Sequence, residues 1–267
     1  MKLLYALGLL AFLAGSCSEQ QTEQAKRVAT PPTSPTAEVV APAATADSSH
    51  MKAVPLAQLP AALRMPGQLL EAWRWTDTNG ENMLVVFRNG PFAEKTTKYT
   101  DEESYVELFA RQYVQRAGSW QQLWRLQDAV RNCPFDLWLG LLPGSTAVTD
   151  LDGDGLSETT LLYKLTCRSD VSPSDLKLIM HEGAAKYALR GQMVVAYDSV
   201  PVSGRAPANP CCLDSISQRQ LNAPDGYELL AGRYESEKEF RKAPAMFLRF
   251  ARQQWRKWSV RDGFDQF

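Results

Sequence analysis

Histidine is scarce in this sequence, and neither sign of charge dominates it. Among 267 residues there are two histidines, His50 and His181, which leaves little material for a histidine metal site or a Ser–His–Asp triad. Lysine and arginine together number 29 and aspartate and glutamate number 30, so the formal net charge is −1. Because proteins bind nucleic acids largely through an excess of positive charge, we expect no nucleic-acid partner.

Other catalytic signatures are missing from the sequence as well. It has no glycine-rich phosphate-binding loop and no Cys-x-x-Cys zinc pattern. His181 and Glu182 could act as a base and its partner, but no serine or cysteine is marked as their nucleophile. No spacing of aspartates and glutamates singles out the two carboxylates of a glycosidase. The sequence therefore favours a protein that is not an enzyme, without excluding one.

The first residues have the pattern of an export signal. Met1 and Lys2 precede an apolar run from Leu3 to Ala14, which is shorter than the ~20 residues that a helix needs to cross a bilayer. Small residues and then Cys17 follow. The segment Leu13-Ala14-Gly15-Ser16-Cys17 resembles the signal of a bacterial lipoprotein, although Ala14 stands where that family prefers leucine. The resemblance implies that residues 1–16 are a signal peptide, cleaved before Cys17.

The same resemblance implies lipidation of the Cys17 thiol and of its new amino terminus. Acyl chains contribute about 0.8 kcal/mol per buried methylene, so two or more chains hold a protein at a membrane without a spanning helix. We expect a lipid-anchored protein of the bacterial cell envelope, on the periplasmic or the cell-surface face, with the membrane as one partner. The alternative is an ordinary signal peptide that is cut nearby and leaves Cys17 as a free thiol.

After Cys17 the composition indicates a tether followed by one folded domain. Residues 18–50 contain no aromatic residue and are rich in Ser, Thr, Gln, Ala and Pro, so they bury too little apolar surface to offset the conformational entropy of folding. We expect the lipidated cysteine and a disordered linker over residues 17–67, which removes His50 from the candidate ligands. All seven tryptophans lie beyond this linker, and we expect a single α+β domain over residues 68–267.

Strand patterns outnumber helix patterns in the domain. Thr78-Asn79-Gly80 separates two strand-like runs and predicts a hairpin, and Gly183 marks a second hairpin. Residues 102–115 suit a helix or a strand, and a turn at Gly118-Ser119 favours the strand. Pro244 precedes aromatic residues at helical spacing and predicts a C-terminal amphipathic helix. The expected fold class is α+β, mostly antiparallel β-sheet with this one helix.

An aspartate-rich loop carries the clearest chemical motif. Carboxylates at alternate positions, followed by a glycine, let a tight loop direct oxygens at one centre, as Ca²⁺ requires. The candidate ligands are the side chains of Asp150, Asp152, Asp154 and Glu158 and the main-chain carbonyl of Leu156. The twelfth loop position is Leu161, where an EF-hand needs glutamate, and the spacing instead resembles the calcium loops of bladed β-propellers and related strand–loop–strand sites. We expect a structural Ca²⁺ ion; the alternative is a hairpin turn whose aspartates cap their own backbone.

Four cysteines remain after Cys17, and an exported protein tends to pair them. They are Cys133, Cys167, Cys211 and Cys212, and four cysteines allow three connectivities. Pairing of Cys133 with Cys167 is favoured, because it would clip the ends of the segment that contains the aspartate-rich loop. Cys211 and Cys212 could then pair only through a strained ring. Alternatively each of them bridges to another partner, or some thiols stay reduced.

The tryptophans admit two interpretations. Five of them could offer stacking platforms for sugar rings: Trp73, Trp75, Trp120, Trp124 and Trp138. Core packing is the commoner fate of a tryptophan, and it is the interpretation that we favour.

Several blocks of the domain together carry a resemblance to a known family. The blocks are Trp75-Thr76-Asp77 with Gly80-Glu81-Asn82, Cys133-Pro134-Phe135-Asp136, residues 149–155, residues 167–173 and parts of 177–191. They resemble small bacterial envelope proteins assigned to surface-polysaccharide biosynthesis, and the likeness covers most of residues 70–258. It implies a role at the cell surface or in its polysaccharide and brings no catalytic residues.

The expected function follows from this resemblance together with the anchor. It is a non-catalytic binding or assembly factor at the membrane, with polysaccharide or envelope proteins as partners. The alternative is a carbohydrate-active enzyme that uses Asp/Glu acid–base catalysis.

Overall fold

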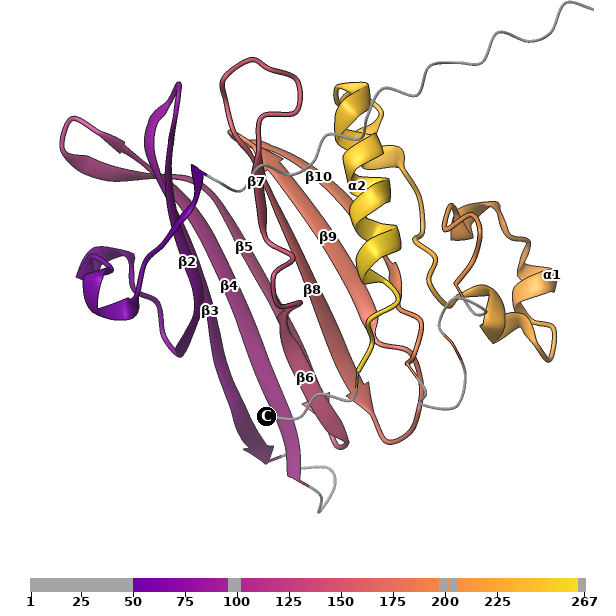
Figure 1. Ribbon diagram of the computed structural model, residues 1–267. Helices are drawn as coiled ribbons and strands as arrows, with labels where there is room; N and C mark the ends of the chain where they lie inside the picture. Colours follow the sequence, from indigo (N-terminus) through magenta and orange to yellow (C-terminus); the bar gives the residue numbers. More distant parts are fainter. Residues whose placement is uncertain (1–49, 96–101, 197–200, 202–205, 264–267) are drawn as a thin grey trace, which may run out of the picture. The chain divides into compact units, whose positions relative to one another are not determined.

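The computed structural model describes residues 50–95, 102–196, 201 and 206–263. The predicted signal peptide, Cys17 and the predicted linker up to residue 49 lie outside these described residues. Within them the chain forms two antiparallel sheets and a helix near the C-terminus, as expected from the sequence (Figure 1).

The first sheet contains five strands in sequence order. They are β1 Lys52–Ala53, β2 Gln68–Asp77, β3 Gly80–Lys95, β4 Glu102–Arg116 and β5 Ser119–Cys133. The predicted hairpin at Asn79-Gly80 joins β2 to β3, and the ambiguous segment after residue 101 is a strand, β4. At the β4–β5 turn both Ala117 (φ 49°) and Gly118 (φ 79°) have positive φ, which is the geometry that twisted hairpins favour.

The second sheet has the strand order β10-β9-β8-β6, and β7 also pairs with β8. The bounds are β6 Asp136–Leu141, β7 Ala147–Thr149, β8 Glu158–Arg168, β9 Asp175–Glu182 and β10 Ala185–Gln192. The predicted hairpin at Gly183 joins β9 to β10. The aspartate-rich loop connects β7 to β8, so strands flank it on both sides, as its motif predicts.

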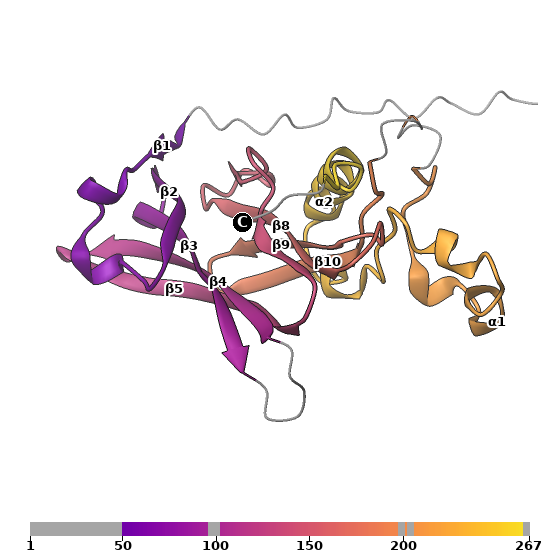
Figure 2. The ribbon, with the colours of Figure 1, turned by 90° about the horizontal axis from the view of Figure 1, so that it is seen from below.

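The helical segments are short apart from one. They are α1 Gln218–Leu221, α2 Ala245–Trp258 and 3-10 turns at Leu56–Gln58, Ala61–Leu63, Leu213–Ser215, Gly226–Leu229 and Lys238–Phe240. Pro244 precedes α2 as predicted, and the buried face of α2 consists of Phe247, Phe250, Ala251, Trp255 and Trp258. Figures 1 and 2 show α2 lying along the side of β8, β9 and β10. In the part of the chain that the structure describes, no helix is long and apolar enough to cross a membrane.

Both sheets are buried on two faces, because alternate residues of a strand point to opposite sides. Leu84 of β3 packs with Leu161 of β8 in a cluster that joins the two sheets. The next residue of β3, Val85, packs on the other side with Leu63 of the N-terminal segment. The next residue of β8, Leu162, packs with the aromatic face of α2. The order of layers is therefore N-terminal segment, first sheet, second sheet and α2.

The folded region begins before residue 68, so the predicted linker boundary is wrong. Lys52 and Ala53 pair with β2, and the segment that follows places Leu59, Leu63 and Met65 against the first sheet. Leu59 is 1% exposed and Leu63 is 2% exposed. The polar composition that indicates a linker ends near residue 50, and the leucines after it have a sheet face to cover. Only the pairing of distant strands creates that face.

Candidate functional site

The aspartate-rich loop folds around the side chain of Asp150. Its Oδ1 accepts a hydrogen bond from the Gly153 amide at 2.9 Å, and its Oδ2 accepts one from the Gly155 amide at 3.1 Å. Asp152 and Asp154 each accept from the amide two residues further along the chain. The self-capping turn that the sequence left as an alternative is therefore present in the loop.

The loop is attached to the β2–β3 turn of the other sheet. The Gly155 carbonyl accepts hydrogen bonds from the amide of Thr78 at 2.9 Å and from its hydroxyl at 2.8 Å. The Ser157 amide donates to Asp77 Oδ2 at 3.2 Å. A Cβ at Gly155 would lie 2.5 Å from Thr78 Cγ2, and its φ is +84°, so this close approach requires glycine. The loop therefore links the two sheets at the end where both turns lie.

Glu158, the first residue of β8, lies beneath the loop and is 0% exposed. It accepts hydrogen bonds from the Thr149 hydroxyl at 2.7 Å and from the Leu151 amide at 3.0 Å. Burial raises the pKa of Glu158 to about 7, although both hydrogen bonds favour the charged form. Its position inside the fold suits a group that holds the loop in place.

Glu182 joins this group from β9, and sequence reasoning did not place it there. It stands directly opposite Glu158 in the β8–β9 register. Burial raises the pKa of Glu182, and the carboxylates of Asp152, Asp154 and Asp150 raise it further. Only the pairing of β8 with β9 brings the two glutamates together, so no spacing in the sequence reveals it.

Two groups of three carboxylates have the proximity that a metal ion needs. One contains Asp150, Asp152 and Glu158, the other contains Asp152, Asp154 and Glu182, and within each group one oxygen from every residue lies within 4.8 Å of the others. The expected ligand set is thus divided, with Asp152 common to both groups. For Leu156 the structure records its amide donating to Asp154 at 2.7 Å. Exposed acidic groups of this kind also occur without an ion.

His181 belongs to a polar cluster between the sheets. Its ring stacks on Trp124 at a centroid distance of 4.2 Å, and its Nδ1 donates to the Ala185 carbonyl at 3.1 Å. Trp124 Nε1 donates to Gln112 Oε1 at 2.7 Å, and Gln112 donates to Asn82 at 2.9 Å. Burial lowers the pKa of His181 to about 4. Its packed position differs from that of a solvent-accessible base beside Glu182.

The tryptophans follow the core-packing interpretation in part. Trp75 and Trp124 belong to the core between the sheets. Trp73 and Trp120 are half-buried and pack against core clusters, and Trp138 is half-buried below the Arg88 guanidinium, 4.9 Å from its ring centroid. None of the five is a fully exposed platform.

The cysteine pairs connect different parts of the fold. Cys133 at the end of β5 is joined to Cys167 of β8 by a disulfide, with a Cα–Cα distance of 5.7 Å, which is the pairing that the sequence favours. It ties one sheet to the other. The neighbours Cys211 and Cys212 are joined to each other, with a cis peptide bond between them.

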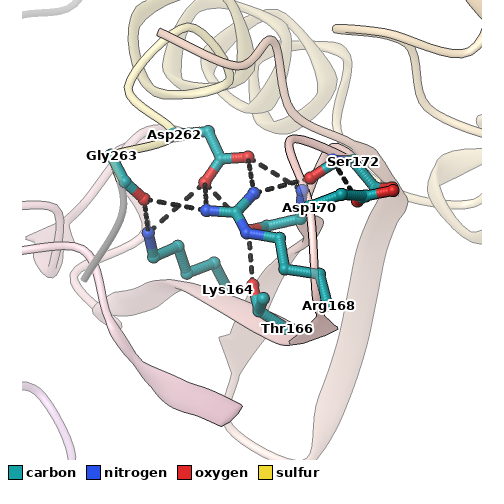
Figure 3. Close-up of polar contacts among 8 residues, drawn as sticks. Lys164, Thr166, Arg168, Asp170, Ser172, Asp262 and Gly263 are labelled. Carbon is teal, nitrogen blue, oxygen red and sulfur yellow. Dashed lines mark hydrogen bonds and ion pairs between the residues drawn. The ribbon is translucent and has the colours of Figure 1, made fainter. Parts of the chain in front are cut away.

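A buried ion cluster, not foreseen from the sequence, lies at the opposite end of β8 (Figure 3). Asp262, which follows α2, accepts from Lys164 Nζ at 3.4 Å and from Arg168 Nη1 at 3.0 Å. Ser174 donates to the same carboxylate from its amide and from its hydroxyl, both at 2.8 Å. These residues lie more than 80 positions apart in the sequence, since Ser174 and Asp262 are separated by 88. The cluster fastens the C-terminal segment to the second sheet.

Comparisons with protein families, with curated proteins and with solved structures find no match to this chain. The chemistry of the loop therefore has to be argued from its own geometry. Carboxylates from β8, from β9 and from the loop surround Asp152, and oxygen-rich groups of this type suit a hard divalent cation.

Proposed function

We propose that this chain is a lipid-anchored protein of the bacterial envelope that acts by binding in the assembly of surface polysaccharide. We further propose that its β7–β8 loop holds a structural Ca²⁺ ion. The anchor rests on the signal pattern that ends at Cys17, and the polysaccharide role rests on the family resemblance of residues 70–258.

One observation supports the calcium proposal most. The carboxylates of Asp150, Asp152 and Glu158 approach to within 4.8 Å, in a loop whose aspartates already alternate in the sequence. Like charges opposite one another in a sheet are unfavourable, as for Glu158 and Glu182, and a dication between loop and sheet offsets that repulsion. The ion would stabilise the attachment of the loop to the β2–β3 turn.

Thermal unfolding with and without calcium tests this proposal. At about 10 mM Ca²⁺, well above the ~10⁻⁴–10⁻³ M affinities of many extracellular sites, we expect the melting temperature to rise by roughly 5–10 °C over that in EDTA. Asp152→Asn, which keeps the shape of the side chain, should abolish the rise. The matched control is Asp225→Asn, on an exposed residue away from the loop. Equal melting curves with calcium and with chelator would refute the calcium proposal.

The anchor has its own test. Mass spectrometry of the mature amino terminus should find Cys17 with thioether-linked and amide-linked acyl chains, and Cys17→Ala should release the protein from membranes. An unmodified Cys17 at the mature terminus, or a membrane-bound Cys17→Ala variant, contradicts the anchor.

The alternative function is a carbohydrate-active enzyme with Asp/Glu acid–base catalysis. The raised pKa of Glu158, about 7, is the property that favours it, because a general acid must be protonated near neutral pH. Against it stands the complete burial of Glu158, which keeps its carboxyl from a polymeric substrate. Incubation of the chain with oligosaccharides, followed by mass spectrometry of the products, decides between them: cleavage that Glu158→Gln abolishes establishes the enzyme.

A further inference from the structure

A cavity of about 390 Å³ lies between the end of β2 and the aspartate-rich loop. Its volume falls in the range of about 300–1,000 Å³ that small-molecule sites occupy. Its walls include Trp75, Asp77, Val148, Asp150, Leu151 and Ser157. Residues from both sheets thus contribute, and the hydrogen bond from Ser157 to Asp77 closes one side.

One wall of the cavity is apolar and carries an unsatisfied donor. Trp75 is 3% exposed, and its buried Nε1 has no hydrogen-bond partner among the described residues. Trp124, in the same core, donates its own Nε1 to Gln112. A buried N–H without an acceptor is unfavourable, so Trp75 stands out as a group with bonding capacity left over. Val148 and Leu151 extend the apolar surface beside it.

The rim of the cavity is rich in acceptors. Asp77 accepts from the amides of Asn79 and Ser157, and Asp150 accepts from the amides of Gly153 and Gly155. Each of these carboxylate oxygens receives a single printed bond, and a carboxylate oxygen has two lone pairs, so both groups can accept more. The Ser157 hydroxyl, which can donate and accept, makes no hydrogen bond with the residues that the structure describes.

A ligand for this cavity needs hydroxyls next to an apolar face. Vicinal hydroxyls donate to carboxylates and accept from an indole N–H, and the C–H face of a pyranose covers an aromatic or aliphatic wall. The carboxylates of Asp77 and Asp150, with those of Asp152 and Asp154 nearby, repel uronic acids and phosphates. This chemistry selects a neutral sugar unit.

We propose that the cavity lined by Trp75, Asp77 and Ser157 binds a neutral hexose unit of a polysaccharide. Trp75 Nε1 and the Ser157 hydroxyl donate to sugar oxygens, and Asp77 accepts from sugar hydroxyls. The inference rests on the proposed binding function and assigns it a place and a class of ligand.

Binding of the full chain to an array of oligosaccharides tests the proposal. The array pairs neutral hexose oligosaccharides with uronic-acid oligosaccharides of equal length, and affinities for its strongest ligand are then measured by titration calorimetry. We expect the neutral members to bind. Trp75→Phe and Ser157→Ala should each weaken that binding by roughly 3- to 10-fold, as expected for one lost hydrogen bond.

Matched controls are Trp120→Phe, which packs on the other face of the first sheet, and Ser215→Ala, in a distant 3-10 turn. Both should change the affinity by less than about twofold, within the range of a substitution outside the site. Melting temperatures of all variants identify any loss of folding, and Ser157→Ala removes only a hydroxyl, so it remains informative if Trp75→Phe unfolds.

The outcomes separate the site from the general function. Neutral-sugar binding that neither Trp75→Phe nor Ser157→Ala weakens overturns the site and leaves the proposed binding function standing. Binding of uronic-acid members alone overturns the ligand class. No binding to any glycan overturns the site and the polysaccharide role together, while the calcium and Cys17 tests still judge the other parts of the proposed function.

Discussion

Replacement of Asp262 by alanine should destabilise this protein more than almost any other single change on its polar residues. The side chain is 0% exposed and accepts hydrogen bonds from Lys164, from both terminal nitrogens of Arg168 and from Ser174. Figure 3 shows Asp262 facing the guanidinium of Arg168, with the Gly263 carbonyl on the neighbouring side. The carboxylate therefore compensates cations that the fold has removed from water.

The magnitude follows from what the truncation leaves behind. Lys164 and Arg168 are both buried, with side-chain exposures of 2% and 7%, and removal of one partner of a buried ion pair destabilises by about 3–5 kcal/mol. Loss of an acceptor for a buried donor such as the Ser174 amide adds a term of about 1–3 kcal/mol when measured alone. Contacting groups do not add independently, so we expect a total near 3–5 kcal/mol.

Urea unfolding followed by tryptophan fluorescence measures this loss, since Trp255 and Trp258 lie in the helix that precedes Asp262. The control is Asp225→Ala, an exposed aspartate whose loss should stay within about 0.5 kcal/mol. Asp262→Asn, which keeps the shape and loses the charge, separates the ionic contribution from packing. A loss below about 1 kcal/mol for Asp262→Ala would refute the reasoning, because it would mean that the two cations do not depend on this carboxylate.

Three further predictions concern the core, the loop and the disulfide. The pKa of His181 is lowered by burial from 6.5 to about 4, so its contribution to stability is complete above about pH 6.5 and is lost as the pH falls to about 4; relative to His181→Phe, the wild type should lose about 3 kcal/mol over that range in urea titrations, and parallel pH profiles would contradict this. Gly155→Ala should destabilise by about 1–3 kcal/mol more than Gly153→Ala, because the new Cβ meets Thr78 Cγ2 at 2.5 Å whereas the one at Gly153 meets nothing within 4 Å; Thr78→Ser should recover the difference in thermal melts, and equal losses at the two glycines would exclude the clash. Replacement of both Cys133 and Cys167 by serine should lower the free energy of unfolding by about 3–4 kcal/mol, since the disulfide closes a loop with a sequence separation of 34; a variant as stable as the oxidised wild type would show that the disulfide adds nothing.

Much of the local structure of this protein can be predicted from its sequence. The hairpin at Asn79-Gly80, the strand over β4, the hairpin at Gly183 and the helix after Pro244 all depend on turn residues and on periodic apolar residues within about fifteen positions. The aspartate-rich loop is visible for the same reason, because its aspartates lie within a few residues of one another. The favoured Cys133–Cys167 pair is present too.

The errors and omissions have a common origin in contacts between distant residues. The predicted linker extended to residue 67 because leucines at 59 and 63 have no periodic pattern of their own, and they become buried only once β2 and β3 form a sheet face. Glu182 enters the acidic group through the β8–β9 register, which a shift of one residue would move to the other face of the sheet.

What the sequence determines by itself is therefore the set of elements and the position of the acidic loop. The tertiary structure decides what surrounds that loop: Glu158 and Glu182 opposite one another below it, the β2–β3 turn bound to Gly155, and the cavity against Trp75. It also decides that Lys164, Arg168 and Asp262 meet in the interior. The physical reason is that turns and helix faces are set by neighbours in the chain, whereas burial and strand register are properties of the whole assembled fold.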